Sequence, residues 1–119
     1  MIWAKIASIL MFLGVALGAF GSHALNNKIS EYHLGVYKTG IFYHFIHTIG
    51  LFVLAWLIVH FQNTKLNLAG IFLTIGILLF SGSLYIYSIT NIRWLGFVTP
   101  FGGVCFLIAW VIIFLNIRL

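Results

Sequence analysis

The stretch Ile41–Phe61 reads IFYHFIHTIGLFVLAWLIVHF and contains no Lys, Arg, Asp or Glu. An α-helix rises 1.5 Å per residue, so about 20 apolar residues cross the roughly 30 Å hydrocarbon core of a bilayer. Backbone groups in lipid must find their hydrogen-bond partners within the chain, and a helix does this within a single segment. We therefore expect this stretch to be a transmembrane helix.

Three further apolar runs have the same character, at about Ile2–Ser22, Leu68–Thr90 and Pro100–Ile117. The alternating apolar and polar residues of a membrane β-barrel are absent from all of them. Together the four runs predict an all-α integral membrane protein. It is a four-transmembrane-helix bundle formed as one domain by residues 1–119.

Composition agrees with this prediction. Of 119 residues, 63% are hydrophobic and 6% are charged, and the mean hydropathy is +1.17. A soluble domain carries about 25% charged residues. These values exclude a soluble globular domain, a disordered chain and a coiled coil. The six basic residues are spread along the chain instead of clustering, which excludes a nucleic-acid partner and favours contact with lipid phosphates.

The connection between the first two runs, residues 23–40, is the longest. Leu25, Ile29, Tyr32 and Val36 recur in it at helical spacing, which predicts a short amphipathic helix in the headgroup region. The alternative is an N-terminal extension of the second span. Before the last run, Thr99-Pro100 predicts an N-cap followed by proline at the first helical position.

The basic residues do not decide the orientation. We call side A the membrane face that holds the N-terminus and the second connection, and side B the opposite face. Side A holds Lys5, Lys65 and Arg118, and side B holds Lys28, Lys38 and Arg93. The two counts are equal, so the positive-inside rule gives no preference.

Unusual residues concentrate in the half of each span that lies toward side B. These segments are Gly18–His23, Tyr43–Thr48, Ser81–Ser88 and Thr99–Gly103. The half toward side A consists almost entirely of Leu, Ile, Val, Phe and Trp. The pattern predicts a polar, glycine-lined zone inside the bundle, within one leaflet.

Histidines at depth in a membrane are rare and raise a functional hypothesis. His44 and His47 are three residues apart, so both face one stripe of the second span. The zone could bind a lipid, quinone, metal or haem, with these candidate ligand-binding residues: His47, His44, Tyr43, His23, Ser81, Tyr85 and Ser88. The alternative is that the same side chains are structural and hydrogen-bond neighbouring helices.

A metal or haem site has few possible ligands. His23, His44 and His47 are the only metal candidates, and His23 with either of the other two is the only possible axial pair for haem. The sequence requires no cofactor and does not identify one.

Glycines let helix backbones approach closely. We expect six of them to serve helix packing, within the bundle or between copies: Gly14, Gly18, Gly21, Gly82, Gly102 and Gly103.

Four segments taken together resemble a known family. They are Gly18–Leu25, the Tyr43-His44-x-x-His47 element, Leu79–Tyr85, and Thr99-Pro100-x-Gly102-Gly103 with Trp110. In order and spacing they resemble the small membrane family DUF423, with departures at Ser22 and Ala109. The resemblance implies a short four-span protein with no established biochemical activity, so it indicates the architecture and leaves the function open.

We therefore expect a non-enzymatic protein of a bacterial cytoplasmic (inner) membrane. Its most favoured role is interaction or assembly through glycine faces, as a homo-oligomer or as an accessory part of a larger membrane complex. The alternative is the binding module described above. A small-solute transporter is less favoured, because the single acidic residue, Glu31, lies outside the apolar runs.

Overall fold

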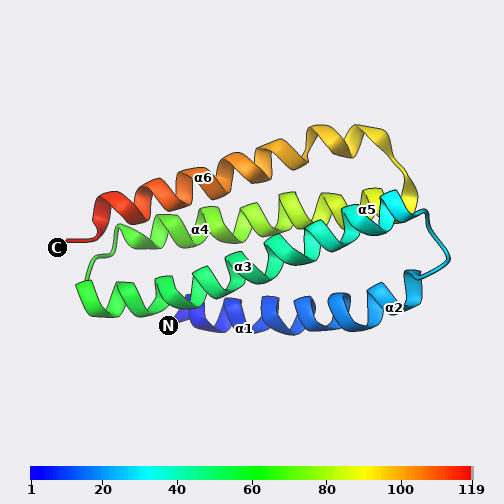
Figure 1. The fold of residues 1–119 in the computed structure, drawn as a ribbon. Coiled ribbons are helices and arrows are strands. Elements are labelled where there is room, and N and C mark those ends of the chain that lie inside the picture. The colour runs from blue at the N-terminus through cyan, green and yellow to red at the C-terminus, as the bar shows by residue number, and fades with distance from the viewer. Residues whose placement is uncertain (119) are drawn as a thin grey trace.

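The computed structural model describes residues 1–118, and these fold into four long helical rods (Figure 1). Two of the rods contain a π-helical segment and one begins with a 3₁₀ turn. The elements are α1 (Ile2–Val15), η1 (Ala16–Gly21, π), α2 (Ser22–Leu25), α3 (Glu31–Phe61), α4 (Leu66–Gly76), η2 (Ile77–Ser81, π), α5 (Gly82–Thr90), η3 (Arg93–Phe97, 3₁₀) and α6 (Thr99–Asn116).

Each rod is long and apolar enough to cross a bilayer. The four are Ile2–Leu25, Glu31–Phe61, Leu66–Thr90 and Arg93–Asn116. The molecule is 49 Å long, which exceeds the roughly 30 Å of hydrocarbon and extends into both headgroup regions. The predicted all-α, four-span architecture is confirmed.

The separate amphipathic helix predicted between the first two spans is wrong. Residues 31–40 are instead the first turns of α3, which runs unbroken to Phe61. Ser30 starts this helix as an N-cap, because its hydroxyl accepts a hydrogen bond from the backbone N–H of His33. The apolar part of this helix still begins near Ile41, so His47 lies six residues, or roughly 9 Å, inside it on the side-B half.

The breaks between spans fall at polar residues in the left-handed conformation. Asn27, Gln62 and Asn91 have φ of 66°, 51° and 56°, and the last two directly follow helices. The predicted N-cap at Thr99 is wrong. The 3₁₀ turn η3 runs almost directly into α6, so Thr99 is already the first residue of that helix. Its hydroxyl instead lies 2.6 Å from Ser83 Oγ.

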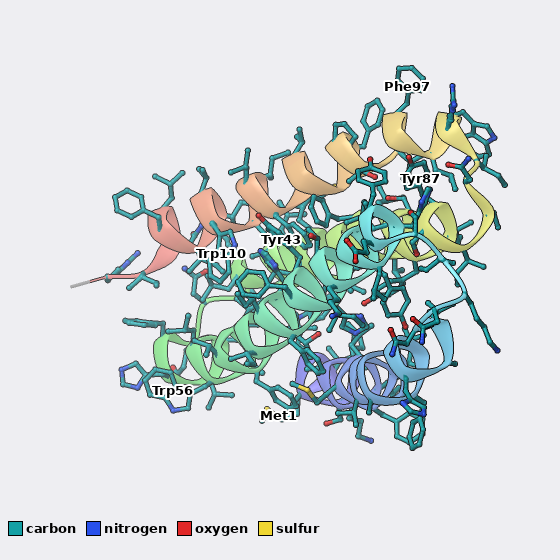
Figure 2. All side chains as sticks on the ribbon, turned by 45° about the vertical axis from the view of Figure 1, so that its right-hand side comes forward. Met1, Tyr43, Trp56, Tyr87, Phe97 and Trp110 are labelled. Carbon is teal, nitrogen blue, oxygen red and sulfur yellow. The ribbon has the colours of Figure 1, made fainter. Side chains whose placement is uncertain are left out.

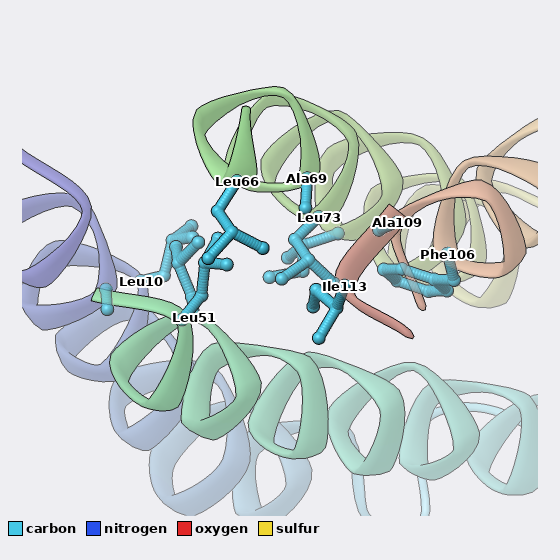
Figure 3. Close-up of a cluster of buried hydrophobic side chains, with 11 residues drawn as sticks. Leu10, Leu51, Leu66, Ala69, Leu73, Phe106, Ala109 and Ile113 are labelled. Carbon is cyan, nitrogen blue, oxygen red and sulfur yellow. The ribbon is translucent and has the colours of Figure 1, made fainter. Parts of the chain in front are cut away.

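A core of leucine, alanine and isoleucine joins the four spans (Figure 3). α3 and α4 face each other across it, with α1 on one side and α6 on the other. The buried members are Ala7, Leu10, Leu51, Leu54, Leu66, Ala69, Leu73, Ile77, Phe106, Ala109 and Ile113. Most lie toward side A, where the sequence is most apolar.

Two polar contacts hold the side-A end. The indole N–H of Trp3 donates to Asn67 Oδ1 at 2.7 Å and ties the start of α1 to α4. The amide of Asn63 donates to the backbone carbonyl of Asn116 at 3.2 Å and ties the second connection to the end of α6. The mostly apolar half of the bundle toward side A is therefore held together at its end by these two hydrogen bonds.

Candidate functional site

His44 is buried between three helices and both of its ring nitrogens have partners. Nε2 lies 2.7 Å from the backbone carbonyl of Leu10 on α1, and Nδ1 lies 2.9 Å from the Tyr85 hydroxyl on α5. A carbonyl can only accept, so Nε2 carries the proton and a neutral ring accepts from Tyr85 through Nδ1. The ring is 3% exposed. His44 thus joins α1, α3 and α5 and has no nitrogen free for a ligand.

His47 faces a different interface. Its ring stacks on Phe106 of α6, with centroids 3.6 Å apart and planes 11° from parallel. Nδ1 donates to the backbone carbonyl of Tyr43 at 2.9 Å. Nε2 has no hydrogen-bond partner among residues 1–118. In this part of the chain, every fully buried side-chain nitrogen or oxygen does have a partner. Nε2 is therefore a hydrogen-bond acceptor that is not fully enclosed, although His47 as a whole is only 6% exposed.

Tyr43 and Trp110 lie beside His47 at the junction of α3 and α6 (Figure 2). The Tyr43 ring is parallel to that of His47 and packs on Phe80, and it is 37% exposed. Trp110 is 41% exposed, and its indole covers Gly50. Neither the Tyr43 hydroxyl nor the Trp110 N–H has a hydrogen-bond partner in the described chain. We call Tyr43, His47 and Trp110 the α3–α6 polar face.

The two candidate serines of the zone each donate to a backbone carbonyl. Ser81 is fully buried and donates to the backbone carbonyl of Gly40 on α3 at 2.7 Å. Ser88 donates to the carbonyl of Tyr85 at 2.8 Å, within its own helix. The predicted ligand-binding residues Ser81, Ser88, Tyr85 and His44 thus come together in the interior, but each satisfies another protein group.

The predicted metal and haem ligands are not brought together. His23 is exposed at the side-B end of the first span. The His44 ring contacts Leu10 and lies against Gly14, nine residues before His23, which places His23 roughly 13 Å further along the helix. The described residues contain no group of three His, Cys, Asp or Glu side chains able to hold a metal. The structure therefore does not bring the three candidates His23, His44 and His47 together at one site.

Most of the predicted packing glycines do lie at helix contacts. A Cβ built on Gly102 would overlap the backbone of Phe80, and one on Gly21 would overlap the Tyr37 hydroxyl. Gly14 and Gly18 lie against α3, and Gly103 is in ordinary contact with Phe80. Gly82 is the exception, because a Cβ there would meet nothing within 4 Å. Its predicted packing role within the bundle is wrong.

Sequence reasoning missed two residues of the interior. Tyr37 is 1% exposed, and its hydroxyl donates to the backbone carbonyl of Leu17. Leu17 lies in the π-helical segment η1, where the normal i to i+4 bonding is interrupted. Gly40 gives room for the Tyr85 ring, whose Cε1 would lie 2.8 Å from a Cβ there. Gly40 lies on the same helical stripe as His44, and this spacing was the signal in the sequence that could have identified Gly40 as an interior residue.

Comparison with known proteins agrees with the architecture. A family model described as "Protein of unknown function (DUF423)" matches residues 17–103. The UPF0382 membrane protein YwdK of Bacillus subtilis is 49% identical over 102 residues, which cover 85% of this chain and 83% of that protein. A UPF0382 membrane protein of Staphylococcus epidermidis is 40% identical over 101 residues, 85% of this chain and 82% of that protein.

The UPF0382 inner membrane protein YgdD of Escherichia coli K12 is 39% identical over 104 residues, covering 87% of this chain and 79% of that protein. No solved structure matches the chain. The relatives are named as membrane or inner membrane proteins, which agrees with the expected location of this chain in a membrane. With the family model covering most of the sequence, this small integral membrane protein belongs to the DUF423 family.

Proposed function

We propose that this protein is an assembly protein that associates with a second copy of itself through the α3–α6 polar face. The observation that carries the proposal is a set of polar atoms in the apolar parts of α3 and α6 that have no hydrogen-bond partner among the described residues. The Tyr43 hydroxyl and the Trp110 N–H can donate, and His47 Nε2 can accept. Lipid tails offer no partner to such groups, so leaving them bare costs free energy.

A second copy suits this set of atoms because the set contains both donors and an acceptor. In a two-fold symmetric contact the same patch meets itself, so a donor on one copy can reach the acceptor on the other, and the reverse. Hydrogen bonds between membrane helices average about 0.6 kcal/mol and reach about 1.7 kcal/mol. Reciprocal pairs would therefore add to the packing of the exposed rings of Tyr43 and Trp110 at the same face.

The hydrogen bonding of the buried polar side chains supports assembly over catalysis. The buried polar side chains pair with neighbouring helices and backbone carbonyls, which makes them structural. Transport driven by a carboxylate is disfavoured as well, because Glu31 lies in the exposed first turn of α3, far from the bilayer centre.

The second candidate is a binding module for an apolar molecule with a polar head, such as a quinone or a lipid. The same three polar atoms, with Phe80 and Phe106 as aromatic walls, favour it. Three pockets of the structure lie at the ends of the bundle, and none of the three is lined by His44 or His47. None of these three pockets therefore supports a small-molecule site at the α3–α6 polar face.

Dilution in lipid tests the proposal. Fluorescently labelled protein in liposomes should show energy transfer between copies that falls as lipid is added. Tyr43→Phe together with Trp110→Phe should weaken association about threefold or more for each hydrogen bond lost, at roughly 0.6 kcal/mol each.

Phe12→Leu is the matched control, since Phe12 is 73% exposed on α1, away from this face. It should leave association unchanged. A wild-type protein that stays monomeric at every dilution, or a double variant that associates as tightly as the wild type, would overturn the proposal. A monomer that retains a quinone or lipid lost in the double variant would favour the second candidate.

A further inference from the structure

A pocket of about 310 Å³ opens at the side-B end of the bundle, between the first turns of α3, the end of α5 and η3. Its polar lining includes Tyr32, Tyr87 and Arg93, and Figure 2 shows Tyr87 at this end. The volume is at the lower end of the range of about 300–1,000 Å³ for small-molecule sites. The pocket is separate from the α3–α6 polar face.

Arg93 gives this pocket a positive charge, and no acidic side chain lines the pocket to neutralise it. Arg93 is exposed, and the only acidic residue in the sequence, Glu31, is not among the lining residues. A guanidinium presents a planar fork of N–H groups that matches two oxygens of a phosphate. The two phenol groups can add hydrogen bonds to the same kind of anion.

The lining of the pocket changes from polar to apolar with depth in the membrane. Val36 and Leu84 also line it, one helical turn further into the membrane than Tyr32 and Tyr87. The polar groups lie near the chain breaks at residues 26–30 and 91–92, at the level of the lipid headgroups. A molecule with a phosphate at one end and hydrocarbon at the other fits this order of residues.

We propose that this pocket binds the phosphate headgroup of an anionic phospholipid, with Arg93 as the main ligand and Tyr32 and Tyr87 beside it. A lipid is favoured over free phosphate because the deeper wall is apolar and the pocket opens at the membrane surface. A zwitterionic headgroup binds less well, because its own cation opposes Arg93 and no lining carboxylate compensates it.

Gly96 provides a way to block the pocket while keeping Arg93. This residue lines the pocket, and a Cβ built on it meets nothing within 4 Å. No glycine of the described chain has positive φ, so the backbone accepts a side chain here. Gly96→Leu should therefore fill the pocket without disturbing the fold.

The test uses the full chain purified in detergent, with dioleoyl phosphatidylglycerol or dioleoyl phosphatidylcholine added, and native mass spectrometry to count retained lipids. The wild type should retain one phosphatidylglycerol at concentrations where phosphatidylcholine is not retained. Arg93→Gln and Gly96→Leu should each raise the apparent Kd about five- to tenfold, the loss expected for one basic contact. Lys28→Gln, a basic residue on the same side outside the pocket, should bind as the wild type does.

Circular dichroism confirms that each variant is folded, and Tyr87→Phe gives a milder third variant with a smaller loss in the same direction. Equal retention of the two lipids would overturn the proposal, as would a loss of binding in Lys28→Gln as large as in Arg93→Gln. Displacement of phosphatidylglycerol by millimolar inorganic phosphate would assign the pocket to free phosphate and overturn the lipid proposal.

Discussion

His44 and His47 lie one turn apart on α3, yet their rings enter different interfaces of the bundle. His44 contacts Leu10 and Tyr85, on α1 and α5, whereas His47 stacks on Phe106 of α6. Both nitrogens of the His44 ring have partners in the interior, whereas Nε2 of the His47 ring has none among the described residues. Two residues of the same type and similar depth therefore have different surroundings.

The Tyr85 hydroxyl should contribute to the stability of the bundle through His44. Tyr85→Phe removes the donor to Nδ1 and leaves a buried acceptor without a partner. We expect the free energy of unfolding, measured by titration with SDS in mixed micelles, to fall by about 1–2 kcal/mol. Tyr43→Phe is the matched control, because the Tyr43 hydroxyl has no partner in the described chain, and it should change stability little in dilute monomers. Equal losses would contradict the structural role of His44.

Gly102 marks the closest approach of the last two spans. A Cβ at this position would lie 2.8 Å from Phe80 Cα, and neither backbone can move without shifting a whole helix. Gly102→Ala should destabilise the protein by about 1–3 kcal/mol. Gly82→Ala meets open space and should be neutral or stabilise by up to about 1 kcal/mol, because alanine favours helix. Thermal unfolding in detergent checks the pair, and the reverse order of stabilities would be incompatible with this packing.

Tyr37 should hold the π-helical end of the first span against α3. Its hydroxyl donates to the carbonyl of Leu17, which lies within the π-helical segment. Tyr37→Phe should cost about 1 kcal/mol and speed amide hydrogen exchange in η1. Tyr32→Phe, an exposed tyrosine one turn earlier on the same helix, should leave that exchange unchanged. Unaltered exchange in Tyr37→Phe would show that this contact does not stabilise η1.

Trp3 and Asn67 should be energetically coupled across the side-A end. Trp3→Phe and Asn67→Leu each remove one partner of the same hydrogen bond. In a double-mutant cycle the two changes should be non-additive, with a coupling energy of about 0.5–1.5 kcal/mol. Trp56→Phe, which alters an exposed indole stacked on His60, should show no coupling to Asn67→Leu. Additive effects for the first pair would mean that the bond contributes nothing to stability.

The spans were predictable because the bilayer imposes a strong and simple requirement on sequence. The four apolar runs are each matched by a rod, and the polar breaks at Asn27, Gln62 and Asn91 lie where the chain turns. The boundary at Glu31 was not predictable from hydropathy. Residues 31–40 are mixed in polarity because they extend α3 into the headgroup region, and a capping Ser30 marks the true start of the helix.

The candidate site was predictable in its residue types and only partly in its geometry. Helical spacing placed His44 and His47 on one stripe, and both are buried as expected for histidines at depth. Spacing gives the direction of a side chain on its own helix but says nothing of which neighbouring helix it meets. The contact of His44 with Leu10 depends on the packing of α1 against α3, where Gly14 allows a close approach.

By itself, therefore, the sequence determined that the protein spans the membrane four times, and that its intramembrane polarity comes from neutral side chains in the absence of charge. Apolar length and hydrogen bonding in lipid are local requirements, which each segment meets or fails alone. Only the tertiary structure decided which polar groups pair with one another and which stay open. That outcome depends on helix order, rotation and close approach, and it leaves His47 Nε2 without a partner in the described chain while both ring nitrogens of His44 are paired.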